Sequence, residues 1–314
     1  MKTPGEGEAV RPLDSVFVTH FKGWAKPGII PPGFLAAAPT ADGSATAPPD
    51  GLTAGVSLVV EPCETLDAIS GHFRLFQLRA GHRFSTDDIL TAWYGTSWCP
   101  SARTVLDLGS GIGTVAMISA WRLPGAKFVT IEAQAESVAL ARKSAQYNGL
   151  GDRYEIRFGD FRESGILAAG ENFDLITGSP PYFALDAGVK SEHPQKLACR
   201  FELRGTIADY CAIAARHLAP GGFFACVFPL ESAQFARVLA AARANDLVIV
   251  RQRPVVFREG DPPLIGLFGL MRAADLPAWF RSHSWTEPDL TIRTRDGKIH
   301  PEYSAVKLAI GFPP

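Results

Sequence analysis

A glycine-rich turn in the middle of the chain combines residue types that can hold a charged ligand. Asp107 ends an apolar run and is followed at alternate positions by Gly109, Gly111 and Gly113. Glycines let a backbone turn approach a ligand without Cβ obstruction, and a helix that begins directly after them offers unpaired N–H groups. A dinucleotide fingerprint requires Gly or Ala where this chain has Thr114. An acid at the strand end suits the ammonium of a methionine moiety, which favours S-adenosylmethionine over a dinucleotide.

Two more acids follow the next apolar runs of the chain. Glu132 comes roughly 20 residues after the glycines, where an acid can accept both ribose hydroxyls of an adenosine. Asp160 ends the following run beside Phe161, and its carboxylate can accept from an adenine amino group. Carboxyl ends of parallel strands form the ligand edge of an open α/β sheet, so the three acids together predict a cofactor site. Taken singly, each acid fits a helix cap equally well, and Gly109 and Gly113 could serve helix packing alone.

A proline pair follows the apolar run 173–178. Ser179, Pro180, Pro181 and Tyr182 form a loop in which the prolines fix the backbone and remove two N–H donors. The Ser179 oxygen and the Pro180 carbonyl can accept from an amine on a planar group, while Tyr182 stacks on its plane. The amine proton can leave after alkylation, so this chemistry depends mainly on positioning. The alternative is a structural Pro-Pro turn with Tyr182 covering the core.

The segments between these residues alternate between strand-like apolar runs and amphipathic runs with helical spacing. This alternation predicts right-handed crossovers and an α/β fold, with a mostly parallel sheet covered by helices on both faces. An antiparallel hairpin over 247–272 is expected to close the sheet edge. The expected strands are 104–108, 127–132, 154–158, 173–177 and 223–228, and the expected helices begin at Thr114 and cover 135–148, 206–218 and 232–245.

The amino-terminal part of the chain has a different character. Residues 1–52 are rich in Pro, Gly and Ala without sustained periodicity, which indicates a poorly ordered extension. We expect one domain over 53–314, made of a lead-in at 53–98 and a catalytic core at 99–314. In the lead-in, strands are expected at 56–62 and 73–78, with turns at Gly71 and Gly81. A helix capped by Ser85, Thr86 or Asp87 should end near Gly95.

Composition excludes several classes of protein. The 314 residues are 46% hydrophobic and 20% charged, which excludes collagen, a coiled coil and disorder throughout. A net charge of −1 supplies no bulk attraction to nucleic acid or to an acidic membrane. No apolar run is long enough for a membrane span, and the start of the chain lacks the apolar run of a secretory signal, so we expect a cytoplasmic protein. No metal is expected, because the cysteines lack zinc-ligand spacing. They are Cys63, Cys99, Cys199, Cys211 and Cys226.

These motifs together resemble a known family. The segments DLGSGIGT, TIEAQ, GDF and SPPYF are similar to those of class I S-adenosylmethionine-dependent methyltransferases, in the small-domain group that contains the valine-tRNA adenine N6-methyltransferases. The resemblance covers roughly residues 56–310 and implies a Rossmann-like fold with S-adenosylmethionine as cofactor. It also implies that Phe84, Thr86 and Asp87 flank the cofactor, that 107–113 hold its methionine part, and that 179–182 hold the acceptor.

One position departs from that family. Ser179 stands where the family usually has Asn, and Ser-Pro-Pro-Tyr is also similar to the motif of DNA cytosine N4-methyltransferases. The leading hypothesis is methylation of adenine N6 in RNA, with cytosine N4 as an alternative for the base. A protein glutamine amide or a small-molecule amine remains a second acceptor class, and a non-catalytic binding module a third. A local basic rim could bind tRNA or other RNA, although its members could equally pair with nearby acids. They are Arg74, Arg79, His82, Arg83, Arg200, Arg204, Arg251, Arg253 and Arg258.

Overall fold

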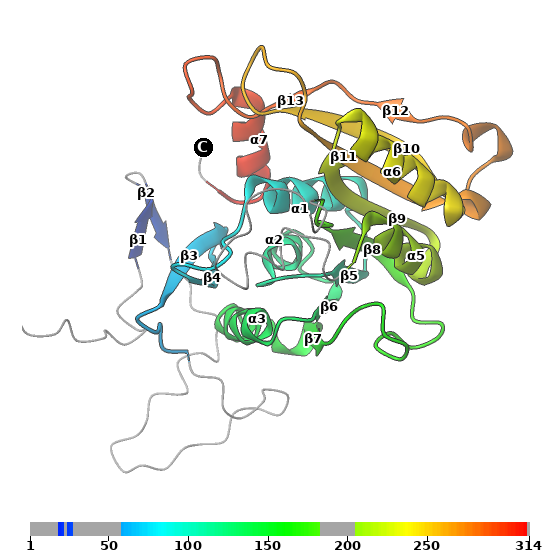
Figure 1. Ribbon diagram of the computed structural model, residues 1–314. Coiled ribbons are helices and arrows are strands. Elements are labelled where there is room, and N and C mark those ends of the chain that lie inside the picture. Colours follow the sequence, from blue (N-terminus) through cyan, green and yellow to red (C-terminus); the bar gives the residue numbers. More distant parts are fainter. Residues whose placement is uncertain (1–17, 22–23, 28–57, 183–204, 313–314) are drawn as a thin grey trace, which may run out of the picture.

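A nine-stranded sheet organises the computed structural model, which describes residues 18–21, 24–27, 58–182 and 205–312 (Figure 1). Its strand order is β12-β10-β11-β9-β8-β5-β6-β7, with β13 also paired to β10. The central strands β5 (Thr104–Leu108), β6 (Lys127–Glu132), β7 (Tyr154–Phe158), β8 (Phe173–Gly178) and β9 (Leu218–Pro229) run parallel to one another. The expected α/β fold with a mostly parallel sheet is confirmed.

The carboxyl-terminal hairpin forms as expected but does not close the sheet. Strand β10 (Leu247–Val256) is antiparallel to β11 (Ile265–Arg272), which in turn is antiparallel to β9. Two short strands, β12 (Trp285–Thr286) and β13 (Leu290–Thr291), pair with β10 on its outer side. The expectation of an edge at 247–272 was therefore wrong, because a later segment supplies partners for the outer backbone groups of β10.

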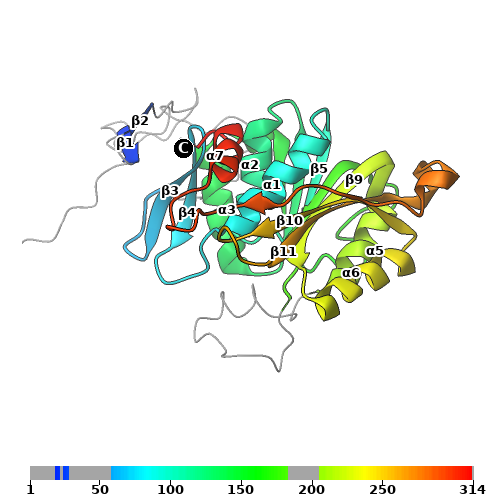
Figure 2. The ribbon, with the colours of Figure 1, turned by 90° about the horizontal axis from the view of Figure 1, so that it is seen from above.

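Helices cover both faces of the sheet, as Figure 2 shows. Helices α1 (Thr86–Trp98), α2 (Thr114–Arg122) and α3 (Ala135–Tyr147) lie on one face. Helices α5 (Ile207–His217) and α6 (Ser232–Ala244) lie on the other. Alternate side chains of each strand face opposite sides, so Val105 joins the first apolar cluster while Leu106 joins the second.

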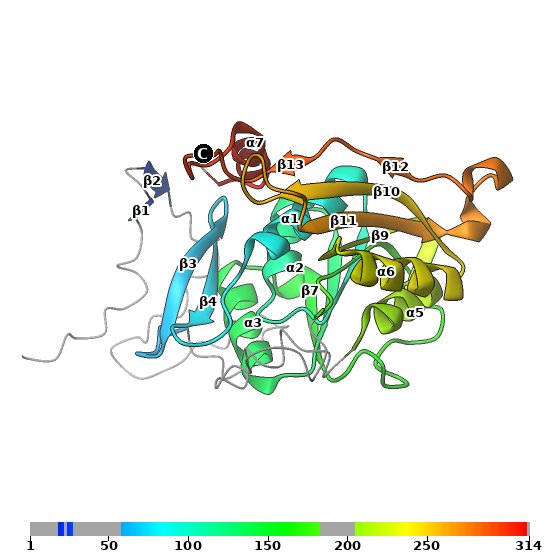
Figure 3. The same ribbon diagram turned by 45° about the horizontal axis from the view of Figure 1, so that its top comes forward.

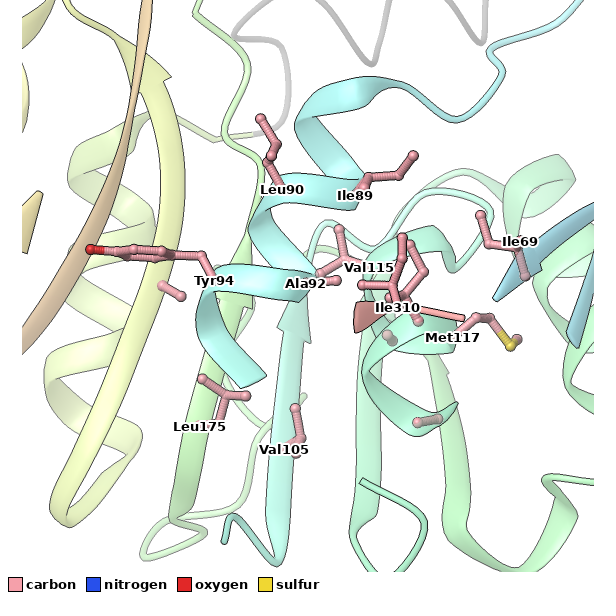
Figure 4. Packing of buried hydrophobic residues seen from close by; sticks show 14 of the residues in the cluster. Ile69, Ile89, Leu90, Ala92, Tyr94, Val105, Val115, Met117, Leu175 and Ile310 are labelled. Carbon is pink, nitrogen blue, oxygen red and sulfur yellow. The ribbon is translucent and has the colours of Figure 1, made fainter. Parts of the chain in front are cut away.

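The cluster under α1 is the larger of the two (Figure 4). Leu90 and Ala92 of α1 are buried with Val105 of β5 and Leu175 of β8. Tyr94 reaches outward from the same helix, and its hydroxyl donates to Glu287 Oε1 at 2.7 Å. Helix α1 continues to Trp98, beyond the expected end near Gly95, because Gly95 is a packing position inside the helix: a Cβ there would lie 3.1 Å from Ala225 and 3.3 Å from Leu175.

A separate two-stranded hairpin precedes α1 and packs beside α2 and α3 (Figure 3). It consists of β3 (Glu64–Ser70) and β4 (Phe73–Leu78). The strand expected at 73–78 is confirmed, but the one expected at 56–62 was wrong. The tight turn at Gly71 and His72 pairs Ser70 with Phe73, so the residues directly before the turn become the partner strand. The β lead-in is thus a hairpin whose first strand lies further along the chain than expected.

The carboxyl-terminal helix α7 (Pro301–Ala309) brings the end of the described chain back to this hairpin (Figure 1). The Gly71 N–H donates to the Gly311 carbonyl at 3.1 Å, and the Ser70 hydroxyl donates to the Ile310 carbonyl. Short 3-10 turns occupy 151–153, 273–275 and 278–280. Within the expected extension 1–52, the structure describes only an antiparallel pair, β1 (Val18–Phe21) and β2 (Trp24–Pro27).

Candidate active site

The residues expected to do chemistry converge on one cavity at the carboxyl ends of the parallel strands. Its volume is about 430 Å³, and its walls come from the start of α1 and the loops after β5, β6, β7 and β8. Most expected residues line it, namely Asp87, Asp107, Gly109, Gly111, Glu132, Asp160, Phe161, Ser179, Pro180, Pro181 and Tyr182. Three do not line it, namely Phe84, Thr86 and Gly113.

The glycine turn presents its backbone to this cavity. Gly111 has φ +56°, and a Cβ added there would meet nothing within 4 Å, so its open side faces free space. Gly109 has φ +60°, and a Cβ there would collide with the Tyr210 hydroxyl. Gly113 is instead the N-cap of α2, and a Cβ there would lie 3.1 Å from the Tyr154 hydroxyl. Its left-handed backbone, with φ +90°, and its packing against Tyr154 account for Gly113, which does not line the cavity.

Asp107 is the most unusual acid of the site. It is 1% exposed, and its Oδ1 accepts from the Thr177 hydroxyl at 2.7 Å. Its Oδ2 is buried and has no hydrogen-bond partner among the described residues. Burial raises the pKa of this carboxyl to about 7. A buried acceptor without a donor is costly, so this oxygen fits a ligand that brings its own positive N–H groups.

Two acids at the start of α1 add to this negative field. Burial and the neighbouring Asp88 raise the pKa of Asp87 to about 6. Burial also raises the pKa of Asp88, whose Oδ2 accepts from the Ser85 backbone N–H at 2.9 Å. Ser85 and Asp88 form a capping box, which fixes the first turn of α1 against the cavity. Several acids close together in a buried site favour a cationic ligand.

Glu132 is held from two sides by backbone groups. Its Oε2 accepts from the Gly111 N–H at 2.9 Å, and its Oε1 accepts from the Gln134 N–H at 2.7 Å. Both carboxylate oxygens are thus fixed in place at the cavity wall. The side chain is buried at the end of β6. Its hydrogen bond with the Gly111 N–H connects Glu132 directly to the glycine turn.

Asp160 and Phe161 also line the cavity, each with a protein partner. The Asp160 carboxylate forms an ion pair with Arg162, with 2.5 Å between Oδ2 and the guanidinium. Phe161 is buried, and its ring meets the Tyr210 ring edge to face at 4.7 Å between centroids. Neither Arg162 nor Tyr210 was predicted from the sequence as a site residue. Arg162 therefore already uses some of the Asp160 lone pairs that could accept from an adenine amino group.

The tetrapeptide 179–182 borders the same cavity. Ser179 Oγ lies 3.5 Å from Thr91 Oγ1 of α1, and Pro180 is buried. The Tyr182 carbonyl accepts from the Gln234 side chain at 3.2 Å, while its ring packs edge to face on Phe228. Phe183 lies outside the described residues. The loop therefore places a hydroxyl, a proline carbonyl and an aromatic ring beside the acids.

Sequence reasoning missed several residues of the cavity wall. Ser110 and Gln134 come from the loops after β5 and β6, and Tyr210 comes from α5. The sequence gave a signal for Ser110 and Gln134, because Ser110 lies between two expected glycines and Gln134 lies two positions after Glu132. Tyr210 had none, because it reaches the glycine turn from a helix about 100 residues further along the chain. The remaining additions include His82, Ser85 and Asp88.

The expected basic rim is only partly available on the surface. Arg74 is buried, and its guanidinium donates to the Phe73 carbonyl at 3.0 Å, so its inclusion was wrong. Arg83 forms an ion pair with Asp67 at 2.8 Å. His82 lines the cavity. Arg200 and Arg204 lie outside the described residues.

The two arginines of β10, Arg251 and Arg253, are held by contacts within the protein. The Arg251 guanidinium lies 3.2 Å from the Trp98 ring centroid and 4.9 Å from that of Trp285. Arg251 and Arg253 share Glu287, at 3.5 Å and 3.9 Å. These side chains anchor β10 to α1 and to the following segment, and the acid neutralises part of their charge.

Among the described residues, no group of three or more His, Cys, Asp or Glu side chains is placed to hold a metal ion. No described helix is long and apolar enough to cross a membrane. Cys63, Cys99, Cys211 and Cys226 are free thiols, and Cys199 lies outside the described residues.

Comparison with known proteins identifies the family. The sequence pattern of the methyltransferase small domain matches residues 95–200. A tRNA1(Val) (adenine(37)-N6)-methyltransferase of Tolumonas auensis is 31% identical over 242 residues, which cover 74% of this chain and 92% of that protein. The chain belongs to the small-domain methyltransferases. It is an S-adenosylmethionine-dependent methyltransferase, and the hypothesis of a non-catalytic module is thereby excluded.

Other similar proteins agree with this assignment. A second small-domain relative, a tRNA1(Val) (adenine(37)-N6)-methyltransferase of Porphyromonas gingivalis, is 30% identical over 173 residues, which cover 54% of this chain and 67% of that protein. The structure of a predicted O-methyltransferase from Agrobacterium tumefaciens has a TM-score of 0.53 and 18% identity, and the match covers 72% of this chain and 98% of that one. This likeness shows the methyltransferase fold.

Proposed function

We propose that this methyltransferase transfers a methyl group to the N6 amine of an adenine in tRNA, with position 37 of a valine tRNA as the first candidate. Two relatives with at least 30% identity bear that name. The observation that carries the proposal is the position of 179–182, which border the same cavity as Asp107 and Glu132. A methyl donor and a planar amine can therefore meet there. Such a substrate also places the reaction in the cytoplasm.

The residues of the cavity fit S-adenosylmethionine. The buried, unpartnered Oδ2 of Asp107 would receive the ammonium of the methionine part, with Asp87 adding negative charge nearby. Glu132, held by the Gly111 N–H, would accept from the ribose hydroxyls. Gly109 and Gly111 would line the methionine part. Asp160 and Phe161 would border the adenine, with Arg162 fixing the orientation of the Asp160 carboxylate.

The acceptor amine would be held by the tetrapeptide. S-adenosylmethionine held there would supply an electrophilic methyl group, which leaves sulfur with its bonding electron pair when the amine nitrogen attacks; the proton that the nitrogen then loses would pass to solvent. Ser179 Oγ and the Pro180 carbonyl accept from the amine and direct its lone pair, while Pro181 keeps the loop rigid. Tyr182 packs on the ring of the base. No residue has to remove the proton before the nitrogen attacks.

A methyl-transfer assay tests this proposal. The enzyme is incubated with methyl-labelled S-adenosylmethionine and an unmodified valine-tRNA transcript, and the nucleosides are separated by mass spectrometry after nuclease digestion. We expect N6-methyladenosine, and none from a control transcript with guanine at position 37. Ser179→Ala should lower turnover about tenfold to a hundredfold, because a lost hydrogen bond in a dry site costs roughly 1 to 3 kcal/mol.

Three other outcomes would contradict it. N4-methylcytidine would move the reaction to the other base amine. Label found only in protein would assign the enzyme to a glutamine amide. Label found only in small molecules would assign it to a free amine.

A further inference from the structure

A buried threonine of α1 contacts the first residue of the tetrapeptide. Thr91 is 1% exposed, and its Oγ1 lies 3.5 Å from Ser179 Oγ. The same Oγ1 donates to the Asp87 backbone carbonyl at 2.8 Å. The contact joins residues 88 positions apart in the sequence and links the acceptor loop to the first turn of α1.

These contacts set the direction of the hydrogen bond between the two hydroxyls. A threonine hydroxyl has one proton and two lone pairs. The Thr91 proton is committed to the Asp87 carbonyl, so Thr91 can only accept from Ser179. The Ser179 proton then points at Thr91, and the lone pairs of Ser179 Oγ remain for the cavity that Ser179 lines. The distance of 3.5 Å is long, but hydrogen bonds of catalytic groups are often long before the substrate binds.

We propose that Thr91 is a positioning residue that turns Ser179 Oγ into an acceptor for the substrate amine. The inference rests on the proposed function, in which that amine is the methyl acceptor. An asparagine amide has a separate oxygen that can only accept, whereas a serine hydroxyl rotates and can present its proton instead. A proton aimed at the amine would oppose the amine N–H groups. By accepting the Ser179 proton, Thr91 prevents this rotation of the hydroxyl. A serine can then act as an acceptor at the position where the family usually has an asparagine.

Two substitutions at Thr91 separate the hydroxyl from the shape of the side chain. Thr91→Val keeps the volume and removes the acceptor, while Thr91→Ser keeps the hydroxyl. Thr96 is the matched control, because it lies on the same helix, is equally buried, and donates to the Ala92 carbonyl four residues back at 2.6 Å. Its hydroxyl contacts the Ala92 and Trp93 carbonyls, and neither residue lines the cavity.

Turnover on the unmodified valine-tRNA transcript is the first readout. We expect Thr91→Val to lower kcat about tenfold, with the KM for S-adenosylmethionine unchanged, and Thr91→Ser to recover most of the loss. Thr96→Val should leave kcat unchanged while losing similar thermal stability. In a Ser179→Ala background, Thr91→Val should cause no further loss, because its effect passes through the serine hydroxyl. Equal losses in both backgrounds would overturn the proposal.

A second readout does not depend on the acceptor. Crystal structures of the wild type and Thr91→Val, each with S-adenosylhomocysteine, report the side-chain rotamer of Ser179. We expect Ser179 Oγ to point at Thr91 in the wild type and to leave that rotamer in the variant. An unchanged rotamer would overturn the positioning role even if the wild type methylates tRNA. A wild type inactive on tRNA would overturn the proposed function while the structures still decide the role of Thr91.

Discussion

Asp107 shows how burial tunes a single residue of the site. Its carboxyl is enclosed at the end of β5, receives one hydrogen bond from Thr177, and has a pKa of about 7. The raised pKa means that the free protein holds a proton there at mildly acidic pH. A cationic ligand would have to displace that proton, so binding and ionisation of Asp107 are coupled.

Cofactor affinity should therefore depend on pH. Below pH 7 the Asp107 carboxyl is protonated and cannot pair with an ammonium, and above pH 7 it is ionised. We expect the Kd for S-adenosylhomocysteine to be about tenfold larger at pH 6 than at pH 8, measured by isothermal titration calorimetry. Asp107→Asn should bind weakly with a flatter profile, because the remaining titration is that of Asp87, whose pKa is about 6. Parallel pH profiles for both proteins would assign the dependence to another group.

At the scale of the element, the first turn of α1 connects the two halves of the site. It carries Asp87 and Asp88, and one turn later Thr91 reaches Ser179. The Ser85 capping box determines where this turn begins. A second capping box, formed by Thr206 and Asp209, starts α5; neither box residue lines the cavity, although Tyr210 of the same turn does. The two boxes allow helix stability to be separated from the shape of the site.

Removing either cap should cost similar stability but have different effects on binding. We expect Ser85→Ala and Thr206→Ala each to lower the free energy of unfolding by about 1 kcal/mol. Ser85→Ala should weaken S-adenosylhomocysteine binding more than Thr206→Ala does, because Asp88 at the cavity wall loses the Ser85 hydroxyl and keeps only the Ser85 backbone N–H. Urea unfolding and calorimetry measure the two quantities. Equal loss of affinity in both variants would mean that lower stability of the whole protein, and not the first turn of α1, weakens binding.

At the scale of the molecule, the carboxyl-terminal segment ties the lead-in hairpin to the body. Gly311 has φ +77°, and a Cβ there would lie 2.6 Å from the Gly71 nitrogen. Gly297 has a similar φ of +82°, with nothing within 4 Å of an added Cβ. Both glycines have the left-handed backbone conformation that favours glycine. Only at Gly311 would an added Cβ collide with neighbouring atoms.

This contrast predicts unequal effects of the same substitution. Gly297→Ala should cost about 1 kcal/mol for the left-handed conformation alone. Gly311→Ala should cost about 2 to 4 kcal/mol, because the methyl also forces the carboxyl-terminal segment away from the hairpin. Urea unfolding midpoints measure both. Similar midpoints for the two variants would show that contact between Gly311 and Gly71 contributes little to stability.

The sequence by itself determined the order of the central strands and helices and the edge at which the acids meet. Apolar runs separated by amphipathic segments require parallel strands, and parallel strands bring residues such as Asp107 and Glu132 to one end of the sheet. The glycine turn and the tetrapeptide could be placed at that end for the same reason. Local patterns also predicted the start of α1, because a helix cap depends on neighbouring residues.

Tertiary structure alone decided the partners of these residues. The sequence placed a strand at 56–62, yet the turn at Gly71 selected Glu64–Ser70. Nothing local brings the Tyr210 hydroxyl of α5 against Gly109 of the glycine turn. The pKa of Asp107 and the contact of Thr91 with Ser179 likewise depend on burial between segments far apart in the chain. Periodicity specifies which face of an element is buried, whereas the side chains that meet there are chosen by packing of the whole molecule.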